Sequence, residues 1–465
     1  MTTTPTAQLS AFVANLRFDD LPPEVVHQAC RFLLDAVGCA IAARAEDPAK
    51  ASHAMQLVAG FHANGPASVI GGAPSDPALA ALANGILINA TDYDDTHKRA
   101  LIHVGSVVVP AALAVTEQAG GSGRDLITAM IAGYEVSTRV GMAVMPTHYR
   151  FWHSTATNGT FGAAAAASHA MGLDAAQTET ALGHAATQAA GLNTFFETGA
   201  DTKSIHPGKA GLNGILSARM AALGLSSPPD SLGHPKGYLA AFSADPQPKA
   251  LTHGIGQEWE ILENGFKYFP SILASHSPIG AALDIATRHA PPPEAITAVR
   301  VRTYATVKSH FSSTRVDTAM AARLSVPYCV AAALRDGQVT QAQFQPDRFR
   351  DSALRQLMNR VEIIADEDLT ALYPEKFPAR VSVHMQGGET YTAGLDYPKG
   401  DPHNPLSDAE LLEKFRRNVA DALPRQQIEN LIQAIMTLPK AQDLQNIGAL
   451  VRGVGVSEKT ARTKG

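Results

Sequence analysis

Residues 76–97 read DPALAALANGILINATDYDDTH, and the rest of the chain can be organised around this stretch. Its first part predicts a helix over 77–90, because Asp76 and Pro77 suit the N-cap and the first helical position and apolar residues recur at helical spacing. Most of its side chains are apolar or small, so we expect the helix to be buried. Its carboxyl end carries a dense polar cluster: Asp92, Asp94, Asp95, Thr96 and His97.

The cluster gains a second imidazole, His103, within a few residues. Charges at the end of a buried helix are expensive unless they are paired, and such groups are usually retained for function. The alternative is a solvated loop whose acidic residues cap the next helix. The cluster alone leaves these two interpretations open, because structural ion networks also perturb pKa values.

Length and composition limit the class of protein. A chain of 465 residues predicts two domains rather than one simple core. The charged residues make up 17%, below the roughly 25% of ordinary soluble domains, which indicates a large helical core or a subunit interface. A net charge of −5 argues against nucleic acid or an anionic membrane as the main partner.

The cysteines and the N-terminal sequence predict a cytoplasmic location. Cys30, Cys39 and Cys329 lack metal-ligand spacing and sit in apolar patterns, as expected for reduced core residues. Residues 1–10 are polar and carry no basic-then-apolar signal. No uninterrupted apolar run reaches about 18 residues, so we expect no membrane span.

The first half of the chain has helical periodicity, and the second half changes. After the break at 291–293 the period becomes two, which predicts a strand over 299–304 and a hairpin over 381–393 turned by Gly387-Gly388. A capping box, Ser407 with Glu410, then restarts helices to 450. Helices are also expected at 22–42, 47–60, 106–117, 124–143, 175–190, 210–223, 275–290 and 319–335, with a strand-like piece at 69–72.

These patterns predict a mainly α protein with two domains. The large helical domain takes residues 1–265 and 396–455, and a smaller α+β lid domain, 266–395, is inserted in it. Residues 456–465 are expected to be a disordered tail.

Two further segments carry basic groups. His153 falls at or just before the start of an alanine-rich helix, where backbone N–H groups favour an anion, although a packing role is commoner. Lys203, His206 and Lys209 fall in a segment that we expect to be a loop, 198–210. Clustered cations at a loop-to-helix junction make a carboxylate receptor, with a solvated basic turn as the alternative.

Five motifs in order resemble the MmgE/PrpD family, which contains 2-methylcitrate dehydratase, cis-aconitate decarboxylase and iminodisuccinate epimerase. The resemblance extends from about residue 8 to 450. The motifs are Asp92-Tyr93-Asp94-Asp95-Thr96 with His103, Trp152-His153-Ser154-Thr155, residues 202–208, Lys267-Tyr268-Phe269-Pro270 and residues 322–328.

The resemblance implies a homodimer that uses neither a metal nor an organic cofactor, with its cleft between the helical domain and the lid. It carries over catalytic or binding roles to Asp92, Thr96, His103, His153, Lys203 and Lys267, with His206 as a neighbour. One position departs from the family pattern. Where the decarboxylases continue Phe-Pro-Ala-His and the methylcitrate enzymes Phe-Pro-Ala-Glu, this chain has Ile272 as the fourth residue, and the nearest imidazole is His276.

The family acts on small polycarboxylates, and removing a proton or carbon dioxide next to a carboxylate requires fixed cations and hydrogen-bond donors. Lys203, Lys267, His103 and Thr96 are the candidates for that stabilisation. Imidazole suits a base near neutral pH, so His103 or His153 is the expected general base, with the other or Asp92 completing proton transfer. His97, beside Lys98 and Arg99, is expected either to bind a substrate carboxylate or to face solvent.

A dehydratase is the foremost expectation, with an epimerase of an iminodisuccinate-like substrate as the alternative. A decarboxylase of the cis-aconitate type is less favoured. So is a metal-dependent hydrolase that would use Asp92, Asp94, Asp95, His97 and His103 as ligands, because the lysines would repel a cation. A non-catalytic helical scaffold is the remaining possibility.

Overall fold

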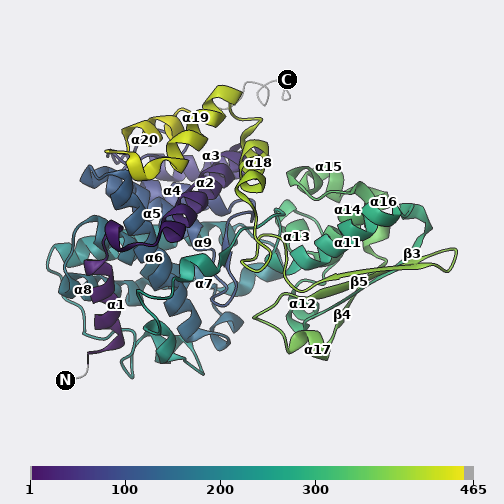
Figure 1. Cartoon of the computed structure of the whole chain (residues 1–465), viewed down its shortest axis with the longest axis horizontal. Coiled ribbons are helices and arrows are strands. Elements are labelled where there is room, and N and C mark those ends of the chain that lie inside the picture. Colours follow the sequence, from purple (N-terminus) through teal and green to yellow (C-terminus); the bar gives the residue numbers. More distant parts are fainter. Residues whose placement is uncertain (1–2, 455–465) are drawn as a thin grey trace.

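The two largest of five hydrophobic clusters organise the structure, a computed structural model that describes residues 3–454 (Figure 1). One core belongs to a large helical domain and the other to a smaller domain with a mixed sheet, so the expected mainly α fold class is confirmed. The boundaries proposed for the two domains stay a prediction, and the tail predicted at 456–465 lies outside the described residues.

The helical domain contains the following helices, joined by loops and short 3₁₀ turns: α1 (Pro5–Asn15), α2 (Pro23–Glu46), α3 (Pro48–Ala59), α4 (Pro77–Asn89), α5 (Gly105–Ala119), α6 (Gly123–Val144), α7 (Ser154–Ala170), α8 (Ala175–Gln188), α9 (Thr202–Ala222), α10 (Tyr238–Phe242), α18 (Asp408–Val419), α19 (Arg425–Met436) and α20 (Gln445–Arg452). A two-stranded ribbon, β1 (Thr96–His97) and β2 (Asn264–Gly265), joins two of its loops.

The smaller domain contains α11 (His276–His289), β3 (Ile296–Thr303), α12 (Ala305–His310), α13 (Ala319–Arg323), α14 (Val326–Asp336), α15 (Pro346–Phe349), α16 (Ser352–Met358), β4 (Val361–Ala365), α17 (Glu367–Thr370), β5 (Ala379–Met385) and β6 (Thr390–Leu395). Its sheet has the order β4-β3-β5-β6, with β3 and β4 parallel and the other pairs antiparallel. Helices α11 and α14 pack against this sheet.

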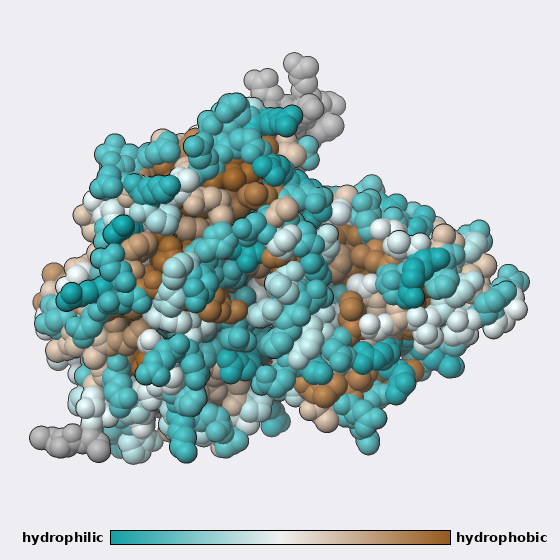
Figure 2. Space-filling view, in the orientation of Figure 1, coloured by the Kyte–Doolittle hydropathy of each residue, from teal (hydrophilic) through white to brown (hydrophobic). Residues whose placement is uncertain are grey.

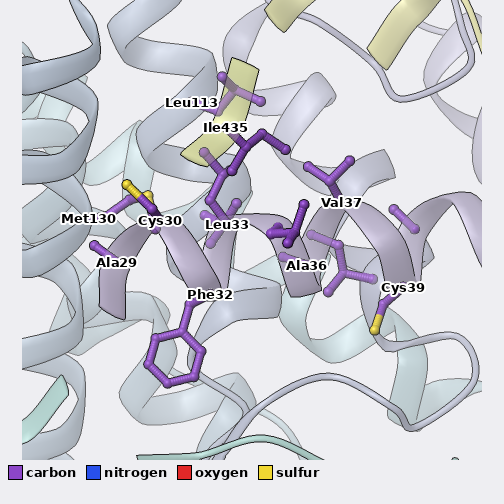
Figure 3. Packing of buried hydrophobic residues seen from close by; sticks show 14 of the residues in the cluster. Ala29, Cys30, Phe32, Leu33, Ala36, Val37, Cys39, Leu113, Met130 and Ile435 are labelled. Atoms are coloured by element: carbon purple, nitrogen blue, oxygen red, sulfur yellow. The ribbon is translucent and has the colours of Figure 1, made fainter. Parts of the chain in front are cut away.

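Helix α2 lies at the centre of the first core. Figure 3 shows Leu33 of α2 beside Ile435 of α19 and near Leu113 of α5, whereas Phe32 points to the opposite side of the helix. The C-terminal helices therefore return to the helical domain, as the yellow ribbon in Figure 1 shows. Among the described helices, α2 alone is long and apolar enough by length and composition to cross a membrane, but 78% of its apolar window is buried in the protein.

Helix α4 forms as its sequence predicts. The carboxylate of Asp76 accepts a hydrogen bond of 2.8 Å from the backbone N–H of Ala78, and Pro77 takes the first helical position. All 13 residues of the helix are buried. The polar residues that follow it are therefore delivered to the interior of the molecule.

Helix α9 begins earlier than the sequence indicates. We expected a loop over 198–210, but the helix starts at Thr202 and includes Pro207. This proline removes only the bond to the carbonyl of Lys203 near the amino end, and close packing on α4 outweighs that loss. Lys203 and His206 consequently stand on the first two turns of a helix, and the expectation of a loop was wrong.

A stability prediction follows from the crossing of α4 and α9. A Cβ atom added at Gly208 would lie 2.2 Å from the backbone oxygen of Leu82, so Gly208→Ala must push the two helices apart. We expect a loss of about 1–3 kcal/mol in the free energy of unfolding, measured by urea denaturation. Gly211→Ala on the same helix is the matched control, because its nearest contact would be an ordinary 3.5 Å. That control should be neutral or stabilising by up to about 1 kcal/mol, and equal losses in the two variants would contradict the prediction.

Three local expectations differ from the structure. The segment 69–72 forms a turn rather than a strand, because the neighbouring pairing is a single bridge between Ala67 and Ser75. The helix expected over 319–335 is split into α13 and α14, since Ser325 caps the second helix through the N–H of Tyr328. Strand β4 was not predicted, although Val361 and Ile363 alternate with more polar or exposed neighbours. The hairpin β5–β6 and the capping box at Ser407 are confirmed.

Candidate active site between the two domains

Asp92 is the centre of the candidate site. It follows α4 with a φ of 53°, in the left-handed region that residues other than glycine seldom adopt. Its Oδ1 accepts from Lys203 Nζ at 2.7 Å and from Lys267 Nζ at 2.5 Å, and Lys267 also donates to its backbone oxygen at 3.0 Å. Burial opposes ionisation, but the two ammonium groups outweigh it and hold the pKa of Asp92 well below its usual range.

Lys267 reaches Asp92 through the ribbon of β1 and β2. Thr96 pairs with Gly265 across this ribbon, so the residues after β2 are held beside the loop that contains Asp92. Asp95 anchors the ribbon to the helical domain. Its carboxylate accepts hydrogen bonds from the side-chain amide of Asn264, from the phenol of Tyr134 at 2.9 Å and from the N–H of Gly105 at 2.9 Å. Burial raises the pKa of Asp95 to about 7. We therefore regard Asp95 as a structural group that positions Lys267.

His103 is an imidazole held between two carboxylates. Its Nδ1 lies 3.3 Å from Asp94 Oδ2 and 3.4 Å from Thr96 Oγ1, while its Nε2 lies 3.5 Å from Asp92 Oδ1. Burial lowers the pKa of His103 below its ordinary value of 6.5, against the opposing charge of Asp94. The ring is therefore neutral at pH 7. In the tautomer that donates Nδ1–H to Asp94, the Nε2 atom keeps the lone pair of a base.

Asp94 is itself held in place by α4. Asn89, the last residue of that helix, donates its side-chain amide to both oxygens of Asp94, at 2.9 Å and 3.1 Å. The backbone N–H of His103 in turn donates to Thr155 Oγ1 at 3.1 Å, on the first turn of α7. The imidazole of His103 is thus fixed by contacts from two helices.

His153 and His206 form a second imidazole pair behind His103. Their Nδ1 atoms are 2.9 Å apart, so one ring donates and the other accepts. His153 stands at the N-cap of α7 as the sequence predicts, and its ring centroid is 6.4 Å from that of His103. Burial lowers the pKa of His153 well below its usual range and that of His206 to about 4. Both rings are neutral at pH 7.

The charged cluster meets a cleft between the domains with about 470 Å³ of empty space. Three of the sequence-predicted residues line it directly: Thr96, His103 and Lys267. The predicted residues Asp92 and Lys203 do not line the cleft. Asp92 contacts Lys267 from the side away from the cleft, and Lys203 contacts Asp92. The other lining residues are Leu101, Tyr149, Ile272, Leu273, Ala274, Tyr304, Thr306, Phe311, Tyr373 and Phe377.

His97 and His276 do not line this cleft. His97 Nε2 lies 3.2 Å from Glu260 Oε2, and its Nδ1 accepts from the N–H of Ala100 at 3.2 Å, so both ring nitrogens are occupied. His276 begins α11, and its Nε2 lies 3.3 Å from the backbone oxygen of Ser271. Burial lowers the pKa of His276 to about 3.

Three tyrosines of the cleft were missed by the sequence analysis. Tyr149, Tyr304 and Tyr373 come from distant parts of the chain, and none of their hydroxyls has a hydrogen-bond partner among residues 3–454. Burial raises the pKa of each phenol, that of Tyr373 to about 12, so all three are neutral donors. No motif marks them, because isolated tyrosines carry no periodic or spacing signal.

The ligand set considered for a metal is only partly assembled. Asp92, Asp94 and His103 have ligand atoms within 4.8 Å of one another, whereas Asp95 and His97 are bound to other partners. Two ammonium groups already contact Asp92 Oδ1, and they would repel a cation there. The arrangement fits an anionic ligand better than a metal ion.

Comparisons with known proteins find relatives over most of the chain. Residues 7–251 match the family model of the MmgE/PrpD N-terminal domain, and residues 269–438 match that of the MmgE/PrpD C-terminal domain. A cis-aconitate decarboxylase-like protein of Aspergillus oryzae is 30% identical over 96% of this chain and 97% of its own. The cis-aconitate decarboxylases of Homo sapiens (28% identity, 96% of this chain and 94% of theirs) and Mus musculus (26%, 98% and 95%) are also similar.

Proposed function

Because the chain belongs to the MmgE/PrpD family, we propose that it is a cofactor-independent lyase. Its substrate is a small polycarboxylate, from which it removes a proton at the carbon next to a carboxylate. The observation that carries this proposal is the group at the floor of the cleft. There a neutral imidazole, His103, and an ammonium group, Lys267, face the same enclosed space. A base beside a fixed cation is the arrangement that proton abstraction next to a carboxylate needs.

We assign the steps to named groups as follows. His103 Nε2 takes the proton, and the electron pair left on carbon spreads into the adjacent carboxylate. Lys267 and the hydroxyl of Thr96 stabilise the charge that develops on that carboxylate. Asp92 and Lys203 keep Lys267 in place and do not themselves line the cleft. His153 supports the site from behind as a positioning residue.

A dehydratase is the activity that the protonation state of His103 favours. In a dehydration, neutral His103 removes a proton, a C–O bond breaks, and the imidazolium that has formed passes this proton to the departing hydroxyl, which leaves as water and returns His103 to its neutral form. A decarboxylation instead needs a proton delivered to carbon after carbon dioxide leaves. Because the pKa of His103 is lowered, little of its imidazole is protonated in the free enzyme at pH 7, and His103 is therefore poorly suited to start as the general acid.

Decarboxylation remains the second candidate because the similar proteins carry that name. Epimerisation is the third, and it would need a second base on the opposite face of the carbon. His153 is the other predicted base, but it is 2% exposed and packs on Phe195 and His206. This packing makes epimerisation the weaker proposal.

The deciding experiment is proton NMR in deuterated water with chelator-treated protein. The panel contains methylcitrate, citrate, cis-aconitate, malate-like hydroxy acids and iminodisuccinate. We expect exchange of a proton next to a carboxylate, accompanied by loss of water, and no effect of the chelator. Product analysis separates dehydration from decarboxylation and epimerisation. Absence of any exchange or conversion by the folded protein, or activity that only a metal restores, would contradict the proposal.

The pH dependence gives an independent prediction. His103 has to be neutral to act as the base, and burial sets its pKa below 6.5. We therefore expect kcat/KM to be level near pH 7 and to fall as the pH drops through a value below 6.5. Burial also lowers the pKa of Lys267 from 10.5, so a second fall is expected on the alkaline side before that value. A rate that rises steadily toward acid pH would show that His103 acts as an acid, and would favour decarboxylation.

We further propose that the protein is a homodimer, which rests on the resemblance and on an uncovered helix face. The cytoplasmic location expected from the cysteines and the N-terminal sequence stays a prediction. Ile205, Leu216 and Leu223 recur on one side of α9 and are 44%, 38% and 81% exposed. On the face drawn in Figure 2, by contrast, hydrophilic residues cover most of the surface, and apolar residues form smaller patches among them. We expect Leu216→Glu to convert dimers to monomers in light scattering after size-exclusion chromatography. A monomeric wild-type protein would refute the proposal.

A further inference from the structure

Away from its charged floor, the cleft is lined by uncharged side chains. Among the described residues that line it, Lys267 is the one with a charged side chain, because the imidazole of His103 is neutral at pH 7. Most of the remaining surface is aliphatic or aromatic, and the neutral hydroxyls of the three tyrosines and of Thr306 interrupt it. The apolar members are Leu101, Ile272, Leu273, Ala274, Phe311 and Phe377.

A second cavity continues this cleft toward the surface. It has about 1230 Å³ of empty space, including open solvent, and it shares five residues with the inner cleft: Leu101, Tyr149, Thr306, Phe311 and Tyr373. Farther out its apolar lining residues are Pro146, Phe151, Leu192 and Phe196, and the polar or charged side chains of Arg150, Asn193, Thr194, Glu197 and His310 also line it. Phe151 and Leu192 are 58% and 50% exposed, which places them at the mouth. An apolar wall of Ile272, Phe311, Phe196 and Leu192 therefore runs from the inner cleft to solvent, with polar and charged side chains beside its outer part.

The floor itself offers little excess positive charge. Asp92 and Asp94 are compensated there by Lys203 and Lys267, and the buried guanidinium of Arg323 adds one further cation near Asp92. With His103 neutral, these two carboxylates, two ammonium groups and one guanidinium together carry one positive charge. Two carboxylates already exceed this charge by one, and a third carboxylate would bury a further negative charge with no cation to compensate it, which is costly.

We propose that the substrate carries an uncharged, largely apolar arm in the place where a tricarboxylate has its third carboxylate. The carboxylates lie at Lys267 and the arm extends along Ile272 and Phe311 toward Leu192. The substrate class is then a dicarboxylate substituted with an alkyl or aryl group. This inference rests on the proposed function, because it concerns the same cleft and the same carboxylate-binding floor.

The expected energetic signature is a gain in affinity with arm length. Each methylene that leaves water for an apolar wall can raise affinity by up to about fourfold. The wall here is partly polar, because of the tyrosine hydroxyls, so a smaller gain is expected for each added carbon. A carboxylate at the end of the same arm would lose its hydration against Ile272 and Phe311 and should bind worse than the alkyl group.

The test is calorimetric titration of the full-length protein with unreactive probes. The probes are succinate, 2-methylsuccinate, 2-propylsuccinate, 2-octylsuccinate and tricarballylate, which is succinate with a carboxymethyl arm. We expect affinity to rise at least about tenfold from succinate to 2-octylsuccinate. We also expect 2-propylsuccinate to bind more tightly than tricarballylate, which has an arm of similar length with a charge at its end.

The outcomes separate this inference from the proposed function. Affinity that stays level or falls along the alkyl series, or tricarballylate binding more tightly than 2-propylsuccinate, would overturn the apolar arm and leave the carboxylate-binding floor intact. If neither succinate nor any other member binds to the folded protein, the proposed function fails together with the inference.

A pair of variants tests whether the arm of the ligand lies along the wall that contains Leu192. Leu192→Asp puts a charge at the mouth, where the side chain is half exposed and the fold should tolerate it. It should weaken 2-octylsuccinate at least about threefold more than it weakens succinate. Leu57→Asp on α3 is the matched control, because Leu57 is 47% exposed and lies outside both cavities, and it should leave both affinities unchanged. An affinity for 2-octylsuccinate that Leu192→Asp does not change would overturn the assignment of the arm to this wall.

Discussion

Lys267→Met should lower kcat/KM by about 100- to 1,000-fold, the range measured when one fixed donor to a developing negative charge is removed. Lys267 is 1% exposed and lines the cleft, so its ammonium group acts in a region from which bulk water is largely excluded. Methionine fills a similar volume without the charge. Asp92 keeps Lys203 as its partner at 2.7 Å, and therefore the variant should still fold.

The measurement is steady-state kinetics on the substrate found by NMR, with thermal unfolding to confirm that the variant is folded. Lys376→Met is the control, because Lys376 pairs with Asp396 on the smaller domain at 3.4 Å and does not line the cleft. Its kcat/KM should stay within about twofold of wild type. Activity within tenfold of wild type in folded Lys267→Met would remove Lys267 from the catalytic machinery.

Asp92→Asn should be the most damaging single change in both stability and activity. The amide has the shape of the carboxylate but no charge, so Lys203 and Lys267 would be left as two buried ammonium groups close to one uncharged oxygen. Removing one partner from a buried ion pair costs about 3–5 kcal/mol. We expect a loss of that size in the free energy of unfolding and a loss of at least about 1,000-fold in kcat/KM, because both lysines lose the group that positions them.

The effect should depend on pH with a definite sign. The folded-state pKa of Asp92 is depressed, so its ionised form contributes its full stability above the unfolded pKa of about 3.9. That contribution is lost only as the pH falls below this value toward the folded pKa. The difference in stability between wild type and Asp92→Asn should therefore be constant from about pH 5 to 8 and shrink only in strong acid.

Urea denaturation at pH 7 measures the loss, and an unchanged m-value would show that the unfolding transition is comparable. Asp408→Asn is the matched control: Asp408 pairs with His27 and Arg31, but its side chain is 53% exposed. Exposed pairs of this kind contribute about 0–1 kcal/mol. Similar losses in the two variants would contradict the role assigned to Asp92.

The floor of the candidate site could be predicted from sequence to a large extent, and its walls could not. Asp92, Thr96 and His103 fall within a short stretch after α4, so their proximity follows from local chain geometry. Lys203 was indicated by a local cluster of cations and by the resemblance to a family, whereas Lys267 was found only through the resemblance. Nothing in the local sequence requires Lys267 to meet Asp92, since that contact depends on the pairing of β1 with β2.

The sequence by itself determined the elements whose signals are local. The cap at Asp76, the capping box at Ser407 and the hairpin turned at Gly387-Gly388 all form as predicted, because each depends on side chains within a few residues of one another. The division into a helical region and a sheet-containing region follows in the same way from the change in hydrophobic period.

Only the tertiary structure decided where α9 begins and what surrounds the substrate. Close approach between α4 and Gly208 holds residues 202–210 helical despite Pro207, which local propensity disfavours. Tyr149, Tyr304 and Tyr373 meet in one cleft because two domains pack together, and no periodicity encodes such a meeting. The chemistry of the floor was therefore readable from short-range sequence and family motifs, whereas the walls of the cleft are assembled from segments that are far apart in the sequence.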